Sequence, residues 1–385
     1  MRVVVDARQA MSRERTGVGH YTMQLLRLLP RVDPGTTYVA WYPSARAALN
    51  LSRTPRLFDE DRPPNLIERA VPIPGAWFER LSAREIPRVE WTVRFEVLFA
   101  PNFIPPPTRA RRLVLTVHDL AFRLFPATAP LATRQWLARL ESALHRAARI
   151  MVVSEQTRRD LLDTYGVADD RVSVVPLGVD AAVFRPAPED AVRAVRQRYG
   201  IEGPYVLTLG GIEPRKNLPA IIRAYLALDA ALRPTLVLAG PVTPWNPEGW
   251  ELLRPALDRL PPSIRERVVF TDYVSENAKA ALLTGAEALV YPSLYEGFGL
   301  PVIEAMACGT PVLTSNVSAL PATAGGAALL VDPRDEEAIT AGIERLITDP
   351  ALRETLRAAG LARAKAFSWR RTAVLTAEVL HEACQ

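Results

Sequence analysis

The sequence is poor in cysteine and has no long apolar run. Its 385 residues contain two cysteines, Cys308 and Cys384, which cannot form a disulfide framework and indicate reduced thiols. No apolar run approaches the roughly 20 residues that a membrane-spanning helix requires. The apolar stretch after Met1 is also too short for a signal peptide. We therefore expect a cytoplasmic chain without a transmembrane segment.

Lysine is also scarce, because the only lysines are Lys216, Lys279 and Lys365. Arginines outnumber acidic residues in residues 1–184, whereas acidic residues slightly outnumber basic ones in residues 185–385. The basic first half suits peripheral contact with the anionic inner face of a membrane, or an anionic acceptor, and a solvated surface explains the same excess. No aromatic-interleaved basic patch is visible, so nucleic acid is not an expected partner.

Metal-binding and nucleophilic motifs are missing as well. The four histidines are scattered and the two cysteines are far apart, so no metal-ligand spacing is visible. Asp59-Glu60-Asp61 has the Asp-x-Asp form of some metal sites, but no strand precedes it and we interpret it as an exposed loop. Gly-x-Ser-x-Gly and the Walker phosphate loop are absent. We expect neither a metal nor a cofactor.

Short apolar runs alternate with helical patterns, which is typical of βα units on parallel sheets. The length suits two domains, and a Pro-punctuated linker covers residues 178–188. The Pro-rich stretch 49–112 shows no clear pattern apart from one apolar run. The expected strands are Arg2–Asp6, Thr37–Tyr42, Leu66–Val71, Leu113–His118, Ile150–Val153, Val172–Val175, Tyr205–Leu209, Thr235–Ala239, Val268–Thr271, Ala288–Tyr291, Pro311–Thr314 and Ala328–Val331. The expected fold is α/β, with two Rossmann-like domains whose parallel sheets face each other across a ligand-binding cleft.

The most informative segment follows the expected strand Ala288–Tyr291. A loop broken by glycines carries Glu296 and leads into a helix that carries Glu304. The free N–H groups at a helix start attract anions, and Gly297 and Gly299 allow the backbone to approach a ligand. Carboxylates beside an anion site are suited to accept hydrogen bonds from hydroxyls. The segment predicts a site for a ligand with phosphate and hydroxyl groups.

A second segment, Gly210-Gly211-Ile212-Glu213-Pro214-Arg215-Lys216-Asn217, also lies between a strand and a helix. Arg215 and Lys216 beside a glycine turn are suited to neutralise a diphosphate and to stabilise it as a leaving group. A lysine at 216 in so arginine-rich a chain suggests a need for a compact charge. A surface charge pair is the alternative interpretation.

Two weaker signals lie in the first half. Gly17 and Gly19 precede a helix and would let its start approach a phosphate, but a structural turn explains them equally and the dinucleotide fingerprint is incomplete. His118 ends an expected strand, where an imidazole could bond a sugar hydroxyl. A core or capping histidine is the alternative.

These segments together resemble the retaining glycosyltransferases of family 4, which have the GT-B fold, and among them bacterial mannosyltransferases. The resemblance covers nearly the whole chain. It is carried by Gly17-Val18-Gly19, Val117-His118-Asp119, Glu213-Pro214-Arg215-Lys216-Asn217, the pair Glu296 and Glu304, Asp332-Pro333 and Phe367-Ser368-Trp369. It implies an acceptor-binding domain at 1–184, a nucleotide-sugar-binding domain at 185–366, and a last helix at 367–385 that crosses back.

The resemblance also implies residue roles. Arg215 and Lys216 would bind the donor diphosphate, Glu304 the ribose, Glu296 the transferred sugar, and His118 would lie near the anomeric centre. Further donor contacts would come from Gly17, Gly19, Gly211 and the backbone of Phe298, Gly299 and Leu300. Relatives need no metal. His20 and Ala322 depart from the residues common at their positions, arginine and an acidic residue.

We expect from this resemblance a retaining, metal-independent hexosyltransferase, with GDP-mannose as the first donor candidate and UDP-glucose among the next. The acceptor would be a saccharide or lipid-linked sugar in surface polysaccharide or glycolipid synthesis. Two alternatives stay open. A GT-B sugar-nucleotide epimerase would need paired acid and base residues, and a noncatalytic nucleotide-sugar-binding protein would not need Glu296, His118 and Lys216 together. A dehydrogenase is disfavoured by the incomplete fingerprint.

Overall fold

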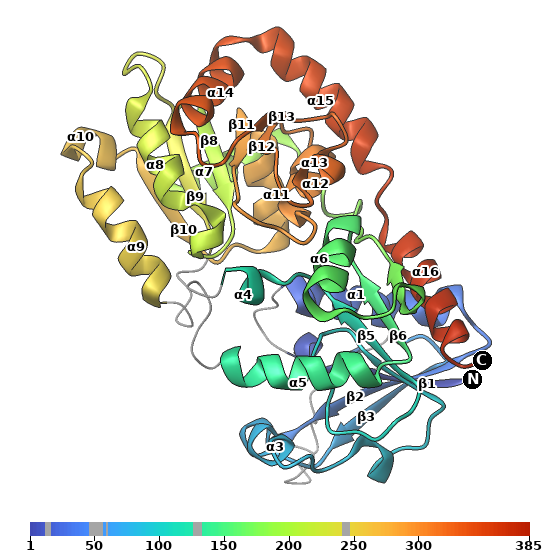
Figure 1. Cartoon of the computed structure of the whole chain (residues 1–385). Coiled ribbons are helices and arrows are strands. Elements are labelled where there is room, and N and C mark those ends of the chain that lie inside the picture. Colours follow the sequence, from blue (N-terminus) through green and yellow to red (C-terminus); the bar gives the residue numbers. More distant parts are fainter. Residues whose placement is uncertain (12–16, 46–56, 59–60, 126–132, 241–246) are drawn as a thin grey trace. The chain divides into compact units, whose positions relative to one another are not determined.

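The computed structural model describes residues 1–11, 17–45, 57–58, 61–125, 133–240 and 247–385 (Figure 1). The chain forms two compact units. Unit 1 comprises Met1–Leu120, Ala132–Gly178 and Trp369–Gln385, and unit 2 comprises Ala121–Leu131 and Val179–Ser368. The chain thus leaves unit 1 after Gly178 and returns to it after Ser368.

Unit 1 is built on a seven-stranded parallel sheet with the order β3-β2-β1-β4-β5-β6-β7. Its strands are β1 Arg2–Asp6, β2 Thr37–Pro43, β3 Leu66–Val71, β4 Val97–Ala100, β5 Leu113–Val117, β6 Arg149–Val152 and β7 Val172–Val174. Every residue of β4 and β5 is buried, as expected for central strands of a parallel sheet that helices cover on both faces. These strands form the core of unit 1.

Strand β4 is the one that the sequence analysis did not assign, because it lies within the Pro-rich stretch 49–112. It has four residues, too few to display a period. Its position is nevertheless central, since Val97 pairs with Val3 of β1 and Leu98 pairs with Leu113 of β5. Pairing with two neighbours, rather than length, stabilises this strand.

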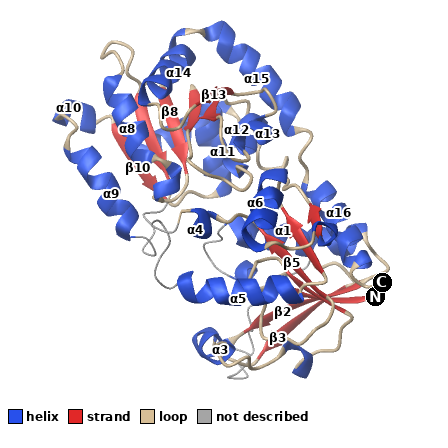
Figure 2. Ribbon diagram, in the orientation of Figure 1, coloured by secondary structure: helices blue, strands red, loops and turns tan. Residues whose placement is uncertain are grey.

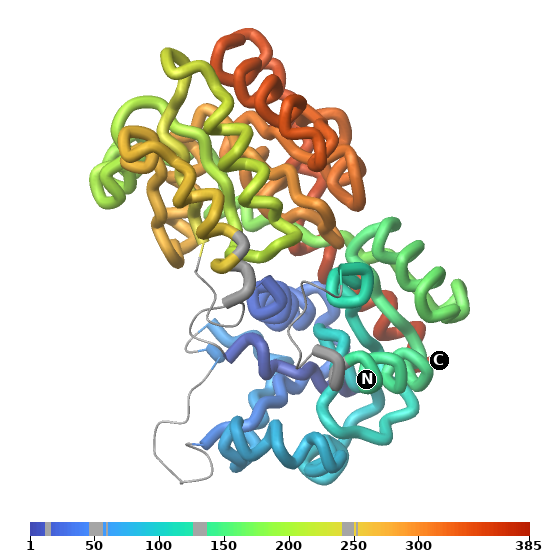
Figure 3. Tube along the Cα trace, turned by 60° about the vertical axis from the view of Figure 1, so that its left-hand side comes forward, coloured from blue at the N-terminus to red at the C-terminus, as the bar shows by residue number. Residues whose placement is uncertain are grey.

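The helices of unit 1 include the last helix of the chain. They are α1 Gly17–Val32, α3 Gly75–Ser82, α5 Thr133–Arg146, α6 Glu155–Tyr165 and α16 Trp369–Glu382. Helix α16 packs on α1, with the rings of Trp369 and Tyr21 6.1 Å apart. Thr372 also donates a hydrogen bond to the carbonyl of Pro176 (2.8 Å). Both chain termini therefore belong to unit 1 (Figure 3).

Unit 2 contains a six-stranded parallel sheet with the order β10-β9-β8-β11-β12-β13 and helices on both faces (Figure 2). The strands are β8 Tyr205–Leu209, β9 Thr235–Ala239, β10 Val268–Asp272, β11 Ala288–Tyr291, β12 Val312–Ser315 and β13 Leu329–Val331. The helices are α4 Ala121–Leu124, α7 Glu189–Tyr199, α8 Leu218–Ala227, α9 Pro247–Asp258, α10 Pro262–Arg265, α11 Glu276–Gly285, α12 Leu300–Ala307, α13 Leu320–Ala324, α14 Glu336–Thr348 and α15 Pro350–Ala364.

Helix α8 shows how sequence and packing agree in unit 2. Its Ile221, Ile222 and Tyr225 are fully buried in a cluster with strand residues such as Leu236 and Val290. Burying each such side chain contributes about 1.5–3 kcal/mol. The burial holds the start of α8, and with it the preceding loop, against the sheet.

The strand order places the functional loops. In unit 2 the order reverses between β8 and β11, which are neighbours in the sheet although the described chain between them forms four α-helices, α8 to α11, and the two strands β9 and β10. Ligands of doubly wound sheets bind outside the carboxyl ends of the strands at such a reversal. Arg215 and Lys216 follow β8, and Glu296 follows β11. The predicted α/β fold with two Rossmann-like, parallel-sheet domains is confirmed.

Candidate functional site

The loops after β8 and β11 bring two cations onto one carboxylate. Lys216 Nζ lies 2.6 Å from Oε1 of Glu296, and Arg215 Nη1 lies 2.8 Å from Oε2. The Glu296 side chain is 9% exposed. Burial by itself raises the pKa of this carboxyl, but Arg215 and Lys216 outweigh burial and lower the pKa from 4.5 to about 2. Glu296 is therefore a carboxylate at every physiological pH.

Tyr291, the last residue of β11, connects Lys216 with the Glu296 carboxylate, and the sequence analysis did not identify it. Its hydroxyl donates to Glu296 Oε1 (2.7 Å) and accepts from Lys216 Nζ. The ammonium also lies 4.9 Å from the centroid of the Tyr291 ring. Burial, and then the charge of Glu296, raise the pKa of Tyr291 well above 10, so the phenol stays a donor. No motif signals this role, because tyrosine is common at strand ends.

Asn217 fixes the position of Lys216 and was likewise not assigned a role of its own. Its φ of +61° is left-handed, a conformation that asparagine tolerates better than most residues. Its Nδ2 donates to the carbonyls of Pro292 (3.1 Å) and Pro333 (2.6 Å). The side chain thus joins the loop after β8 to the loop after β11 and to the turn after β13.

Glycine backbone lets these loops approach each other. Gly240 follows β9 with φ +154°, and a Cβ atom there would lie 2.0 Å from the carbonyl oxygen of Gly210. The carbonyl of Gly211 accepts from the N–H of Glu213 (2.9 Å), which closes the turn that leads to Arg215. A side chain at Gly240 would displace the loop after β8.

The loop after β11 ends at the start of α12. Gly299 has φ +95° and precedes Leu300, the first residue of the helix. The carbonyl of Phe298 accepts from Thr323 Oγ1 (2.5 Å), and the backbone N–H of Glu296 donates to Ser318 Oγ (3.1 Å). Segment 315–323, where Ala322 departs from the family pattern, therefore supports this loop. The carbonyl of Ala322 itself accepts from Arg363 (2.6 Å).

Glu304 lies in the middle of α12 and is 8% exposed. Its Oε1 is 2.8 Å from Nζ of Lys279, which comes from the first turn of α11. The Lys279 ammonium also lies 4.7 Å from the centroid of the buried Phe184 ring. Lys279 is therefore a second lysine paired with a glutamate of this segment. The scarcity of lysine in the chain was the only available signal for it.

Unit 1 brings its own candidates together. Gly17 and Gly19 open α1, where Gly17 is exposed and Gly19 is buried. Tyr21 of the same helix meets the His118 ring edge-on, with the centroids 4.9 Å apart. His118 Nε2 lies 2.8 Å from the carbonyl of Pro101, so this nitrogen carries the proton. Burial lowers the pKa of His118, which keeps the imidazole neutral at pH 7.

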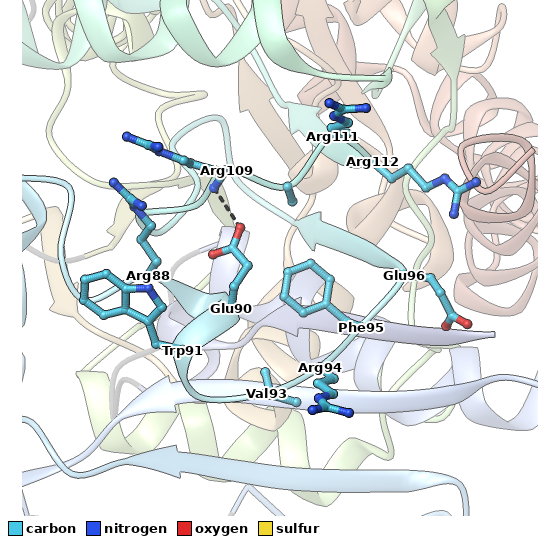
Figure 4. Close-up of a pocket in the computed structure, with 11 residues that line it drawn as sticks. Arg88, Glu90, Trp91, Val93, Arg94, Phe95, Glu96, Arg109, Arg111 and Arg112 are labelled. Atoms are coloured by element: carbon cyan, nitrogen blue, oxygen red, sulfur yellow. Dashed lines mark hydrogen bonds between the residues drawn. The ribbon is translucent and has the colours of Figure 1, made fainter.

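Unit 1 also carries an arginine-rich pocket of about 810 Å³ before β4 and β5 (Figure 4). Its guanidinium groups belong to Arg88, Arg94, Arg109, Arg111 and Arg112. The guanidinium carbon of Arg88 lies 5.6 Å from the centroid of the Trp91 ring, which is 62% exposed. Glu90 accepts from the backbone N–H of Arg109 (2.7 Å). Within the described ranges, none of these five guanidinium groups has an ion pair or hydrogen bond.

Two features are absent from the part of the chain that the structure describes. No group of three or more histidine, cysteine, aspartate or glutamate side chains is arranged to hold a metal ion. No described helix combines the length and the apolar character that crossing a membrane would need. Asp59 and Glu60 of the Asp-x-Asp segment lie outside the described residues.

Comparisons with known proteins define the class. Residues 193–363 match the family model of glycosyl transferases group 1, and residues 15–183 match that of glycosyltransferase family 4. The fold resembles the sucrose-phosphate synthase of Thermosynechococcus elongatus, with TM-score 0.75 and 21% identity over 99% of this chain and 98% of that one. It also resembles Anabaena Alr3699/HepE in complex with UDP and glucose, with TM-score 0.74 and 17% identity over 99% and 100%. The fold is therefore that of GT-B glycosyltransferases.

Sequence relatives give the family. The O-antigen chain mannosyltransferase B of Escherichia coli is 31% identical over 95% of this chain and 96% of its own length. The serotype-specific mannosyltransferase WbdA of Escherichia coli is 35% identical over an aligned region that covers 60% of this chain and 28% of WbdA. The chain belongs to glycosyltransferase family 4, and it is a glycosyltransferase.

Proposed function

We propose that this glycosyltransferase moves a hexose from a nucleotide-diphospho-sugar to an acceptor hydroxyl with retention of configuration and without a metal. The observation that carries the proposal is the pair Arg215 and Lys216 at the strand-order reversal of unit 2, on the same carboxylate. Lys216 has three N–H donors, of which Glu296 and Tyr291 use two, and no other described residue accepts the third. That donor is available to a phosphate oxygen.

The chemistry follows from charge development. When the bond from the anomeric carbon to the phosphate oxygen breaks, negative charge grows on the diphosphate. Arg215 and Lys216 stabilise that charge, because preorganised donors in a shielded site require little reorganisation. The acceptor hydroxyl attacks the same face and gives up its proton to the departing phosphate. Glu296, held as a carboxylate, accepts hydrogen bonds from hydroxyls of the transferred sugar.

Mannose from GDP-mannose is our first proposal for the donor, because relatives of this chain are mannosyltransferases. The name of the O-antigen chain mannosyltransferase supports an acceptor in surface polysaccharide synthesis. We propose that this acceptor is a saccharide or a lipid-linked sugar and that the reaction takes place at the cytoplasmic side of the membrane. UDP-glucose is the next candidate, since a protein of similar fold forms a complex with it. An epimerase would convert the donor without an acceptor, and a noncatalytic binding protein would not convert it.

A thermal-shift panel tests the donor class. GDP, UDP, ADP and their sugar conjugates are added with EDTA, and then with magnesium, because a ligand of the folded state raises the melting midpoint. We expect one nucleotide to raise the midpoint without metal, Lys216→Met to reduce that shift, and the exposed Lys365→Met to retain it in full. No shift at millimolar ligand would overturn the diphosphate assignment.

Measurements of turnover distinguish a glycosyltransferase from an epimerase and from a noncatalytic binding protein. The sugar conjugate that raises the melting midpoint most is incubated with and without an acceptor such as p-nitrophenyl α-mannoside, and the products are identified by NMR. An α-linked disaccharide formed in EDTA supports retention without metal. A β-linked product overturns retention, activity that needs magnesium overturns metal independence, and conversion of the donor sugar without an acceptor supports the epimerase.

We also propose that unit 1 contacts anionic lipid through the arginine-rich pocket. Five guanidinium groups that form no ion pair with a described residue, lining one pocket with an exposed indole, make the type of surface that binds anionic headgroups. The test is co-sedimentation with phosphatidylglycerol vesicles and with phosphatidylcholine vesicles. The double variant Arg88→Gln with Arg109→Gln should weaken binding to the anionic vesicles tenfold or more, because each arginine near an anionic surface contributes about 1 kcal/mol to the binding free energy.

The matched control is Arg198→Gln with Arg259→Gln, two exposed arginines of unit 2. Arg198 also stacks on an aromatic ring, that of Tyr199, at 5.4 Å. Equal binding of wild type to both kinds of vesicle, or equal losses in the two double variants, would overturn the lipid proposal.

A further inference from the structure

Lys279 is the basis of an inference that rests on the proposed function and extends it. We propose that Lys279 is a positioning residue for donor recognition, which holds the Glu304 carboxylate in the one orientation that accepts hydrogen bonds from vicinal hydroxyls of the nucleotide's ribose. Lys279 itself would make no contact with the donor.

The geometry leaves one oxygen of Glu304 available. Lys279 Nζ binds Oε1 at 2.8 Å, and no other described residue forms a hydrogen bond with either oxygen. A glutamate side chain has three rotatable bonds, so an unanchored carboxylate would sample several orientations. A charge-assisted bond to one oxygen selects one of them. Oε2 is then presented for an outside donor.

The support behind Lys279 makes the anchor rigid. The lysine lies in the first turn of α11, which begins after Ser275, whose hydroxyl caps the helix by accepting from Ala278 N–H. Its ammonium lies 4.7 Å from the centroid of the Phe184 ring, and Phe184 is 4% exposed. The Lys279 side chain is 23% exposed and that of Glu304 11%. Glu304 is thus restrained by burial, and the partly exposed Lys279 by its place in a capped helix and by the buried Phe184 ring.

Charge gives the pair a second effect. A lone carboxylate near a diphosphate would repel the ligand, because like charges repel each other strongly where little water separates them. The ammonium of Lys279 cancels the charge of Glu304 while leaving an acceptor oxygen in place. The pair therefore presents hydrogen-bonding capacity without net charge, which suits the recognition of hydroxyls beside an anion.

The test measures recognition of the ribose hydroxyls. Titration calorimetry compares the nucleoside diphosphate that wild type binds best, among GDP, UDP and ADP, with its 2′,3′-dideoxy analogue. We expect wild type to prefer the ribonucleotide about tenfold or more, since hydrogen bonds to a carboxylate are lost in the analogue. Lys279→Met should reduce this preference severalfold, and Lys279→Arg should restore part of it.

Lys365→Met is the matched control, because it makes the same substitution at the exposed third lysine, and it should retain the full preference. If Lys279→Met retains the full preference, the inference is overturned while the proposed function stands. If wild type binds no nucleoside diphosphate, or does not distinguish the two ligands, the proposed role of Glu304 fails, and the inference fails with it.

Lys279→Met leaves Glu304 buried without a partner, and this single variant can fail to fold. A double variant keeps the test decisive in that case. Lys279→Met with Glu304→Gln removes both charges. If Lys279 acts through Glu304, the double variant binds the ribonucleotide as Glu304→Gln does. A further loss of tenfold in the double variant would mean that Lys279 contacts the ligand directly, and would overturn the positioning role. In turnover, Lys279→Met should raise KM and leave kcat nearly unchanged.

Discussion

Lys216 Nζ lies 2.6 Å from Glu296 Oε1, although eighty residues separate the two in the chain. They are neighbours because β8 and β11 are adjacent in the sheet of unit 2. A second lysine, Lys279, pairs with Glu304 in the same way. Two of the three lysines in an arginine-rich chain therefore pair with the two glutamates of the segment after β11.

Lys216→Met should lower kcat by roughly 10²–10³-fold, the loss that is usual when a donor to developing charge is removed. KM for the donor should change less, because the interaction is strongest in the transition state. Steady-state kinetics with the donor identified by thermal shift is the measurement. A kcat equal to that of Lys365→Met would contradict the role of Lys216.

Stability should fall at acid pH because of Glu296. Its pKa is about 2 in the folded chain and ordinarily 4.5, so the unfolded chain binds more protons between these values. The stabilisation is present above pH 4.5 and is lost as the pH falls toward 2, to an extent on the order of 3 kcal/mol. Urea unfolding from pH 7 to pH 3 measures it.

Glu296→Gln is the comparison for this pH effect. It should be less stable than wild type at pH 7, because Arg215 and Lys216 lose a buried partner. The difference between the two proteins should shrink as the pH falls. Parallel curves for both proteins down to pH 3 would contradict the lowered pKa of Glu296.

Gly240→Ala should damage both stability and donor binding. The new methyl group would lie 2.0 Å from the carbonyl oxygen of Gly210, at a left-handed φ of +154°. Relief requires movement of the loop that carries Arg215 and Lys216, and we expect a cost of about 2 kcal/mol or more. Gly35→Ala is the control, since a Cβ there meets nothing within 4 Å and its φ is ordinary. Similar urea midpoints for both variants would refute the close approach.

Asn217 offers a test that separates backbone conformation from hydrogen bonding. Asn217→Gly tolerates the left-handed φ but loses the hydrogen bonds to Pro292 and Pro333. Asn217→Ala loses these hydrogen bonds and is also strained at the left-handed φ. We expect losses of about 1–3 kcal/mol for the glycine variant and about 1 kcal/mol more for alanine. Urea unfolding measures both. Equal stability of alanine and glycine variants would argue against conformational strain at this position.

His118 should stay neutral at pH 7. Burial lowers its pKa below 6.5, so the unfolded chain takes up the proton first as the pH falls. This group therefore reduces stability below about pH 6.5, and His118→Asn should weaken that trend. NMR of ring-labelled histidine measures the titration directly. A titration midpoint for His118 above 6.5 would contradict the burial argument.

Local sequence patterns predicted much of the fold. The apolar run Tyr205–Leu209, followed by glycines and a helical pattern, identified β8 and the loop after it because each signal acts within a few residues. The four-residue β4 shows the limit. Its stability comes from β1 and β5, which are distant in the sequence, so no local pattern revealed its place.

Arg215, Lys216, Glu296, Glu304 and the glycine loops were all visible in the sequence by itself, since strand-loop-helix junctions attract anions through local backbone geometry. Only the tertiary structure decided which charges meet. Neighbouring strands that are remote in the chain set Lys216 on Tyr291 and Glu296, and packed helices set Lys279 on Glu304. Such pairs depend on sheet order and helix packing, and both are products of long-range burial, which no short segment of the sequence contains.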